Sequence, residues 1–274
     1  MIYLIRRRKL GRGSCRGIKQ FSQQGIRSFR NDRRLPEAEL VFRWGCTSNL
    51  PGQPRIVNEA EAIHLTVDKI AFRKKLQAEQ LCPITWFPES IELPHYPVIV
   101  RPRNHAQGRR LHMCRTREEF YAAKARYPGG WYASEFINKV AEYRVFVCQG
   151  RAVWVANKIP GNPADIAWNV ARGGKFENVG WTEWPLRVVK TAIAAWKLSG
   201  LDFGGVDVMV DGEGKPYVLE INAAPSQTSP YRQQCVAKAF DWIVQRGKAE
   251  IPLQEEKGGY RKFIHPAVCA EAKL

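Results

Sequence analysis

The chain has 274 residues, of which 45% are hydrophobic, and it carries a formal net charge of +17. This length and apolar content suffice for a substantial core, in one large domain or in two to three small ones. No apolar run is long enough to cross a bilayer, and the short stretch Ile2–Ile5 precedes the first positive charges instead of following them. We therefore expect neither a membrane span nor a secretion signal.

The cysteine pattern argues against a zinc site. Seven cysteines occur singly without CxxC spacing, and the five histidines show no metal-ligand pattern. An odd number of scattered thiols favours reduced cysteines in a cytoplasm, where buried cysteines usually behave as small hydrophobes. The seven are Cys15, Cys46, Cys82, Cys114, Cys148, Cys235 and Cys269.

The positive charge is concentrated near the N-terminus. Residues 1–35 contain eleven lysines and arginines against one acid, and the rest of the chain carries +7. This distribution favours an acidic or nucleic-acid partner at the N-terminus, although a basic protein with no such partner is the other interpretation. The expected docking positions are Arg6, Arg7, Arg8, Arg12 and Ser14.

Residues 1–66 are predicted to form a small basic α/β unit. Ile2–Ile5 is expected to be a strand, Ser14–Gln24 a helix with Ser14 as its N-cap, and Glu39–Trp44 a second strand. The polar loop Gly45–Asn49 follows, in a position where loops often carry function.

Residues 67–129 are predicted to form a second unit, in which helices and strands alternate. Its expected elements are a helix from Asp68 to Gln80 capped by Thr66, a strand at Tyr96–Arg101, a basic loop at Pro102–Arg110, a return strand at Leu111–Cys114, and a helix opened by the capping-box residues Thr116–Glu119.

Residues 130–250 are predicted to form a third unit, and residues 251–274 a tail without a clear period. The expected strands are Trp131–Ile137, Tyr143–Cys148 and Ala152–Asn157, with a tight turn at Gln149–Arg151. The expected helices are Trp184–Leu198, with Leu186, Val189, Ile193 and Trp196 on its apolar face, and Gln233–Gln245.

Between these two helices, carboxylates occur where a buried sheet should have none. Apolar and polar residues alternate in Gly204–Asp211, and a glycine-rich turn leads into a return arm at Lys215–Asn222. Side chains two apart in a strand share a face, so Asp207, Glu220 and Asn222 converge if the arms pair. Two carboxylates and an amide oxygen are hard ligands suited to Mg²⁺ held together with phosphates. An amphipathic hairpin with a solvated polar face is the alternative.

Further polar positions follow the same chain order. Arg101 ends a strand, Tyr132–Ile137 is followed by Glu142–Arg144, Lys158 ends another strand, and Trp168–Gly174 comes next. In this order the pieces resemble the ATP-grasp superfamily and are most similar to its ribosomal-protein glutamate ligases and related amino-acid ligases.

The most specific match is the proline-terminated run Glu220-Ile-Asn-Ala-Ala-Pro225. The resemblance covers roughly residues 66–230. Residues 1–65 are more loosely similar to the shortened front domain of phage-encoded ATP-grasp proteins, for example at Phe42–Gly45.

The resemblance implies an α+β fold in which two α/β lobes clasp ATP beside a short basic N-terminal α/β domain. It implies ATP and Mg²⁺ as cofactors. Matched to the family's motif, the metal ligands are Asp207, Glu220 and Asn222; the nucleotide contacts are Arg101, Glu135, Phe136, Ile137, Glu142 and Leu219; and the groups near the transferred phosphate are Arg144, Lys158, Asn169 and Arg172.

Some positions depart from the family pattern or allow a simpler interpretation. Arg101 stands where most members have a lysine that reaches the α-phosphate, and the predicted phosphate-covering loop His105–Arg110 has only one internal glycine. Arg144 has an alternative role as an ion-pair partner of Glu142. Lys69 has two interpretations, a nucleotide contact or, more simply, a charge on a helix surface.

We therefore expect an enzyme that joins a carboxylate to an amine through an acyl phosphate, releasing ADP and phosphate. The carboxylate is expected to belong to an amino acid or a peptide. Two alternatives remain open: the same chemistry on a nucleic-acid acceptor, as in phage DNA modification, and a non-catalytic nucleic-acid-binding protein that keeps the fold. The intact set of predicted metal ligands argues against the second. Oligomerisation is also left open.

Overall fold

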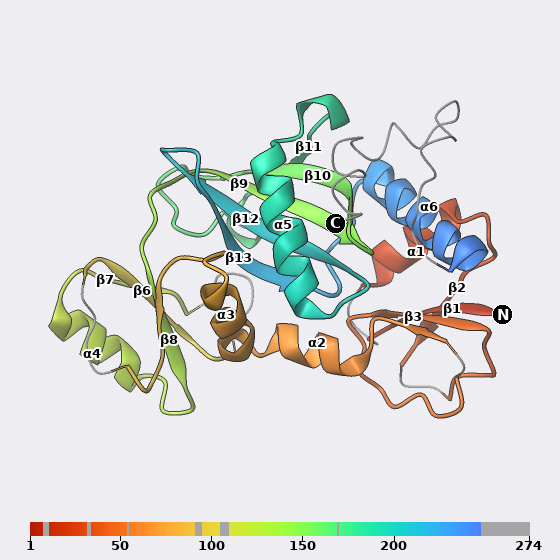
Figure 1. The fold of residues 1–274 in the computed structure, drawn as a ribbon, viewed down its shortest axis with the longest axis horizontal. Helices are drawn as coiled ribbons and strands as arrows, with labels where there is room; N and C mark the ends of the chain where they lie inside the picture. The colour runs from red at the N-terminus through yellow and green to blue at the C-terminus, as the bar shows by residue number, and fades with distance from the viewer. Residues whose placement is uncertain are drawn as a thin grey trace.

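The computed structural model of the protein describes residues 1–7, 11–31, 34–53, 55–90, 95–104, 110–168 and 170–247. Three sheets follow one another along the long axis of the molecule (Figure 1). Their strand orders are β2-β1-β3-β4 in the N-terminal sheet, β5-β8-β6-β7 in the small sheet, and β11-β10-β9-β12-β13 in the central sheet. Four predictions lie wholly or mostly outside the described residues: the site residue Asn169, the basic residue Arg8, the phosphate-covering loop at residues 105–109, and the tail 251–274, which includes Cys269.

The N-terminal sheet is parallel, so each strand returns through a connection across the sheet. Ser14 lies inside helix α1, so its prediction as an N-cap is wrong. The cap is Gly11, whose φ of +73° is a backbone conformation that glycine adopts without a steric penalty. The elements are β1 (Ile2–Arg6), α1 (Arg12–Phe21), β2 (Arg27–Arg30), β3 (Leu40–Trp44) and β4 (Ile56–Val57).

The small sheet is antiparallel and includes a strand that the sequence placed elsewhere. The strand at Trp131–Glu135, predicted for the third unit, pairs with two strands of this sheet. Thr116 caps its helix as predicted, accepting a hydrogen bond from the Glu119 backbone N–H at 3.3 Å. The elements are α2 (Ala60–Val67), α3 (Lys69–Ala78), β5 (Thr85–Trp86), β6 (Val98–Pro102), β7 (His112–Cys114), α4 (Arg117–Ala125) and β8 (Trp131–Glu135).

The N-cap of α3 is Asp68, not Thr66. The Asp68 carboxylate accepts hydrogen bonds from the backbone N–H groups of Ile70 and Ala71, both at 3.2 Å. The Thr66 hydroxyl instead donates to the Ile63 carbonyl inside α2. Two short helices therefore meet at Asp68, where the sequence predicted one.

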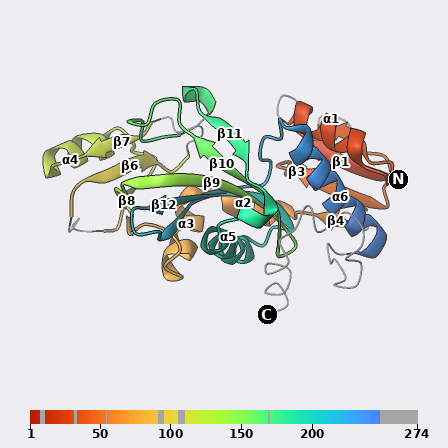
Figure 2. The same ribbon diagram turned by 90° about the horizontal axis from the view of Figure 1, so that it is seen from above.

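The central sheet is antiparallel and is long enough to hold both a core and a polar cluster. Helix α5 covers one of its faces, while α6 and α1 lie side by side at its N-terminal-domain end (Figure 2). The elements are β9 (Lys139–Cys148), β10 (Arg151–Ile159), a 3₁₀ turn at Val170–Arg172, β11 (Lys175–Asn178), a second 3₁₀ turn at Trp181–Glu183, α5 (Leu186–Ser199), β12 (Phe203–Asp211), β13 (Pro216–Asn222) and α6 (Pro230–Arg246).

The two faces of the central sheet differ because successive strand residues point to opposite sides. On one face, valines such as Val145 and Val206 pack against α5. On the other, Phe146, Trp154 and Phe203 join the core shared with the N-terminal sheet and α6. Further along this second face the apolar side chains give way to charged ones, and there the candidate site begins.

The apolar face of α5 differs slightly from the prediction. Val189 and Ile193 are buried as expected, but Leu186 is 39% exposed, so its predicted core position is wrong. Leu186 is the first residue of the helix, where no partner element covers it. The neighbouring Val188 and Ala192 complete the buried face instead.

Six cysteines lie in the described part of the chain, and all six are free and buried. Burial raises the pKa of Cys15 and of Cys235 to about 12, so both thiols stay protonated at neutral pH. None of the described helices combines the length and the apolar character needed to cross a membrane.

The N-terminal sheet is fastened to the central sheet through aromatic stacking and one buried asparagine. Phe42 of β3 stacks on Phe240 of α6 with ring centroids 4.3 Å apart. Asn58, at φ +67°, accepts hydrogen bonds from the backbone N–H groups of Asp202 and Phe203, and its amide donates to the Phe203 carbonyl. These three bonds join the end of β4 to the start of β12.

We expect Asn58→Ala to lower the free energy of unfolding by about 3 kcal/mol, because it leaves buried backbone groups of Asp202 and Phe203 unpaired. Urea unfolding followed by tryptophan fluorescence measures the change. Asn178→Ala is the matched control, since its side chain is exposed and makes one long bond to Ser229. Equal losses in the two variants would contradict the anchoring role of Asn58.

Candidate functional site

The hairpin of β12 and β13 brings the three predicted metal ligands together. Asp207 lies opposite Glu220, and Gly205 lies opposite Asn222, so the three polar side chains share one face. The Asn222 amide donates to the Glu220 carboxylate at 2.9 Å. Asp207 is only 3% exposed, which rules out the alternative of a solvated polar face.

A β-bulge sets the direction of these side chains. Asp207 pairs with Glu220 but the next residue, Val208, pairs with Val218, so Leu219 is an extra residue on β13. Without the bulge, Val218 and Glu220 would share a face. With it, Val218 packs in the core under α5 and Glu220 points to the polar cluster. The Arg73 guanidinium donates to the Leu219 carbonyl at 2.8 Å and so supports the bulge.

Arg144 is held by Asp207 across the pairing of β9 with β12. Its Nε and Nη2 lie 2.5 and 2.7 Å from the two oxygens of Asp207, a bidentate ion pair. The alternative that Arg144 pairs with Glu142 is therefore wrong. The Lys158 ammonium lies 3.3 Å from Asp207 and also bonds Glu142.

Two further lysines complete the cluster, and the sequence indicated neither of them clearly. Lys139, at the start of β9, bonds Glu142. The Lys69 ammonium lies 3.3 Å from the Glu220 carboxylate and is 14% exposed, so the interpretation as a helix-surface charge is wrong. The sequence signal for Lys69 was Asp68, a residue type that favours helix N-caps, because a cap there makes Lys69 the first residue of α3. The ion pair of Asp68 with Arg103 also holds this first turn.

The ionic state of the cluster follows from its pairing. Burial opposes the charged form of Asp207, but Arg144 and Lys158 outweigh it and hold its pKa below the ordinary value. Burial likewise opposes the charged form of Lys158, but Asp207 and Glu142 outweigh it and raise the pKa of the ammonium. Burial lowers the pKa of Lys139, and Glu142 offsets only part of this effect.

Of the nucleotide contacts predicted from the resemblance, Glu142 is part of the cluster and Arg101 lies near it. Arg101, on β6, has a buried Nε without a partner in the described residues, and its charge adds to the lowering of the Lys139 pKa. Residues 136–138 cross from β8 to β9, between the small and central sheets. Within this crossing, the backbone N–H groups of Glu135 and Phe136 donate to the carbonyls of Ile84 and Pro97.

Other predicted residues are not brought to the cluster. Arg172 has a half-exposed side chain on the 3₁₀ turn, and its guanidinium lies 3.8 Å from Asp165. Arg6 is only 8% exposed, so its predicted place on a docking surface is wrong because the strand buries it. Arg7 and Arg12 are exposed, as that surface requires.

The donor set fits a hard cation bound with phosphates. The ion-paired cluster contains four cations and three carboxylates, an excess of positive charge that suits a polyanion. Among the described residues, no group of three or more His, Cys, Asp or Glu side chains is arranged so that it could hold a metal ion by itself. A metal at the hairpin would thus be held by Asp207, Glu220 and the Asn222 amide oxygen, leaving positions for phosphate oxygens, as Mg²⁺ prefers.

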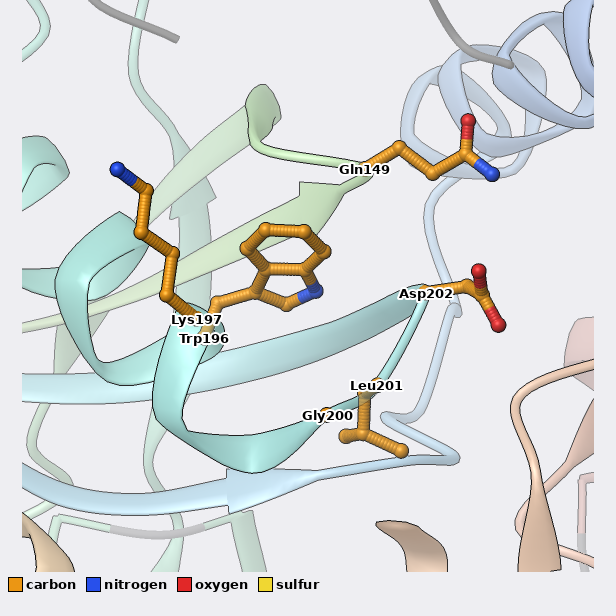
Figure 3. Close-up of a pocket in the computed structure, with 6 residues that line it drawn as sticks. All are labelled: Gln149, Trp196, Lys197, Gly200, Leu201 and Asp202. Atoms are coloured by element: carbon orange, nitrogen blue, oxygen red, sulfur yellow. The ribbon is translucent and has the colours of Figure 1, made fainter. Parts of the chain in front are cut away.

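A depression in the surface lies away from this cluster, at the start of β12. It is an open depression of about 500 Å³ lined by residues of α5 and the turn between β9 and β10 (Figure 3). The side chains of Lys197 and Asp202 point away from one another, and the Asp202 carboxylate accepts a hydrogen bond from the Asn58 backbone N–H. Its lining residues are Gln149, Trp196, Lys197, Gly200, Leu201 and Asp202.

Solved structures place this architecture in the ATP-grasp class. A D-alanine–D-alanine ligase from Bacillus anthracis is similar with a TM-score of 0.66, at 16% identity, over 94% of this chain and 99% of that one. The ATP-grasp ligase PsnB, complexed with a minimal precursor, gives a TM-score of 0.63 at 13% identity, over 89% and 98% of the two chains. At these identities the likeness establishes the fold, and it confirms the expected α+β ATP-grasp architecture.

Residues 62–242 match the model of the RimK-like ATP-grasp domain, and the chain belongs to that family. Curated relatives named probable alpha-L-glutamate ligase, from Aliivibrio fischeri strain MJ11 and Aliivibrio salmonicida strain LFI1238, are each 30% identical over 187 residues. The match covers 62% of this chain and 59% of each relative, so the chain spans less than two thirds of their length.

We expect Asp207→Asn to lower the free energy of unfolding of the metal-free protein by about 3 kcal/mol at pH 7, because the buried Arg144 loses its anionic partner. The pKa of Asp207 is lowered in the folded state. The stabilisation is therefore complete above the ordinary value of 3.8 and is lost as the pH falls through the lower folded value.

Urea unfolding in the presence of a chelator, measured from pH 7 down to pH values below 3.8, checks this expectation. The difference between wild type and variant should shrink at the acidic end. Glu213→Gln changes the same charge in the exposed turn of the same hairpin and should cost less than about 0.5 kcal/mol. A difference that stays constant with pH would refute the ion-pair assignment.

Proposed function

We propose that this protein is an ATP-dependent ligase that joins a carboxylate to an amine and releases ADP and phosphate. The observation that carries the proposal is the buried cluster at the hairpin, where Asp207 and Glu220 meet cations from three other elements. Membership of the RimK-like ATP-grasp family and the ligase names of the relatives support it.

Mg²⁺, held by Asp207, Glu220 and Asn222, would offset the charge of the ATP phosphates. The cations that now pair with these carboxylates, Lys69 and Lys158, would then be free to contact phosphate oxygens.

The adenine is proposed to lie against the crossing between β8 and β9, above Leu219. The N–H groups of Glu135 and Phe136 are already bonded, so the Glu135 carbonyl and the Ile137 N–H are the backbone groups proposed to contact it.

The chemistry needs cations more than it needs a protein nucleophile. A substrate carboxylate oxygen attacks the γ-phosphorus, the bond to the bridging oxygen breaks, and ADP leaves. The amine nitrogen then attacks the carbonyl carbon of the acyl phosphate, loses a proton, and phosphate leaves. Both partners in the first step are anionic, so Arg144 and Lys158 are proposed to stabilise the transferred group as charge redistributes.

The relatives' names suggest the first substrate to try. They are named alpha-L-glutamate ligases, so an amino acid such as L-glutamate is proposed as one of the two partners, with the free carboxylate of a second amino acid or of a peptide as the other. Binding both partners beside ATP would make each step effectively unimolecular.

Asp207→Asn and Glu220→Gln are each expected to lower ADP formation by at least about a hundredfold, because each removes one charged ligand for the metal. A coupled ADP-release assay with amino acids and peptides as substrates measures the rate, and circular dichroism checks the fold. Glu213→Gln is the control and should keep the wild-type rate. Normal turnover by either site variant would show that the metal assignment is wrong.

Removing Mg²⁺ with a chelator is expected to abolish ADP formation, and adding Mg²⁺ back in excess should restore it. The reason is that the hairpin offers only two carboxylates and an amide oxygen, which bind a metal weakly without phosphates. Calorimetry should therefore show that Mg²⁺ binds far more tightly with ATP present than without it. ADP formation that continues in the chelator would contradict the proposal.

A further inference from the structure

A second cation-rich position lies next to the cluster, at the first turn of α6. Arg232 is only 4% exposed, and its guanidinium carbon lies 5.5 Å from the ring centroids of both Trp154 and Phe176. Its Nε is buried without a hydrogen-bond partner, and no carboxylate of the described residues forms an ion pair with it. Burial of an arginine without an anion is costly, so an unpaired guanidinium here calls for a ligand.

Arg232 differs from the neighbouring cations in having no carboxylate partner among the described residues. Arg144, Lys158 and Arg232 all lie over the ring of Phe176, at 4.8, 5.5 and 5.5 Å from its centroid. Arg144 and Lys158 have carboxylate partners, whereas Arg232 has none among the described residues. Burial lowers the pKa of Arg232, the nearby charge of Arg144 lowers it further, and no acid opposes the two effects.

An unsatisfied amide lies on the same segment. Gln227 is 1% exposed, and neither its amide nitrogen nor its amide oxygen has a partner in the described residues. Its backbone is well fixed: the N–H donates to the Ser14 hydroxyl at 2.9 Å, and the carbonyl accepts from Gln233 at 2.7 Å. A buried side-chain amide without hydrogen-bond partners, held on a fixed backbone, is typical of a ligand-binding position.

The segment that carries both residues runs directly from the candidate metal site. A Cβ at Gly205 would lie 2.7 Å from Pro225 and 3.5 Å from the Arg144 side chain, so the chain after Asn222 passes over the sheet beside that ion pair. A Cβ at Gly45, in the loop after β3, would lie 2.7 Å from Ala224. Residues 224 and 225 therefore lie between the Arg144 side chain and the loop after β3.

We propose that Arg232, assisted by the Gln227 amide, binds the non-reacting carboxylate of an amino-acid substrate, the partner whose amine attacks. This inference rests on the proposed ligase function. The reacting carboxylate requires the cations already assembled around Asp207, so a neighbouring cation with no ion-pair partner among the described residues serves a second carboxylate. The guanidinium fork suits a carboxylate in bidentate geometry. The substrate is thereby an amino acid with a free carboxylate, and not a simple amine.

The test compares acids with their amides. A panel of the twenty standard amino acids, with the α- and γ-amides of L-glutamate, is assayed by ADP release and by calorimetric binding with ADP and Mg²⁺ present. Arg232→Met is expected to weaken binding and raise KM for the preferred amino acid about 10- to 100-fold, with KM for ATP unchanged. For wild type, replacing the bound carboxylate of the substrate by an amide should raise KM by the same factor of about 10 to 100. For Arg232→Met, the KM values for the acid and for the amide should be equal.

The matched control is Arg246→Met, at the exposed end of the same helix, which should behave as wild type. Stability separates binding from a structural role: Arg232→Met should be as stable as wild type or more so, because it removes an unpaired buried charge. A loss of stability, or a KM for the amide that still exceeds that for the acid in Arg232→Met, would overturn the proposal.

The binding measurement also separates the carboxylate site at Arg232 from the proposed ligase activity. Carboxylate-dependent binding that requires Arg232, in a protein that forms no ADP with any substrate, would keep this site and reject the ligase. ADP formation with no carboxylate-dependent binding by any amino acid would keep the ligase and reject this site. Arg232-dependent binding of inorganic phosphate, without any amino acid, would also reject it.

Discussion

The ion pair between Arg144 and Asp207 is the interaction around which the site is organised. It joins β9 to β12 at the point where the apolar part of the sheet face ends and the charged part begins. Both side chains are nearly buried, so each depends on the other for its charge. On the other side of β12, Glu220 lies opposite Asp207, and Lys158 reaches both Asp207 and Glu142.

The charges around this pair form two neighbouring regions. In the first, carboxylates and cations satisfy one another, and a metal with phosphates can enter by exchange, because the cations have phosphate oxygens as new partners. In the second, the Arg232 Nε and the Gln227 side-chain amide have no hydrogen-bond partners among the described residues, so they are arranged for a ligand from the start. The proposed reaction needs both, because ATP and an amino acid must lie side by side.

The wrong predictions share a physical cause. Ser14 has the composition of an N-cap, but its hydroxyl is used by the Gln227 backbone, more than two hundred residues away. The strand Arg27–Arg30 was not predicted because it is short, charged and at a sheet edge. The strand Trp131–Glu135 joins the small sheet through pairing with residues about thirty positions earlier. Each depends on contacts between segments that are distant in sequence.

The sequence by itself determined the hairpin and its three metal-like residues, because alternation and turn chemistry act over a few neighbouring positions, and the resemblance of its motifs to the ATP-grasp family implied the fold class. Tertiary structure alone decided that Arg144 pairs with Asp207, that a bulge at Leu219 turns Glu220 toward the cluster, and that Arg232 is buried with no carboxylate partner in the described part of the chain. These features come from strand register and from the docking of α6. Such features arise only when distant segments meet and exclude water from the charges between them.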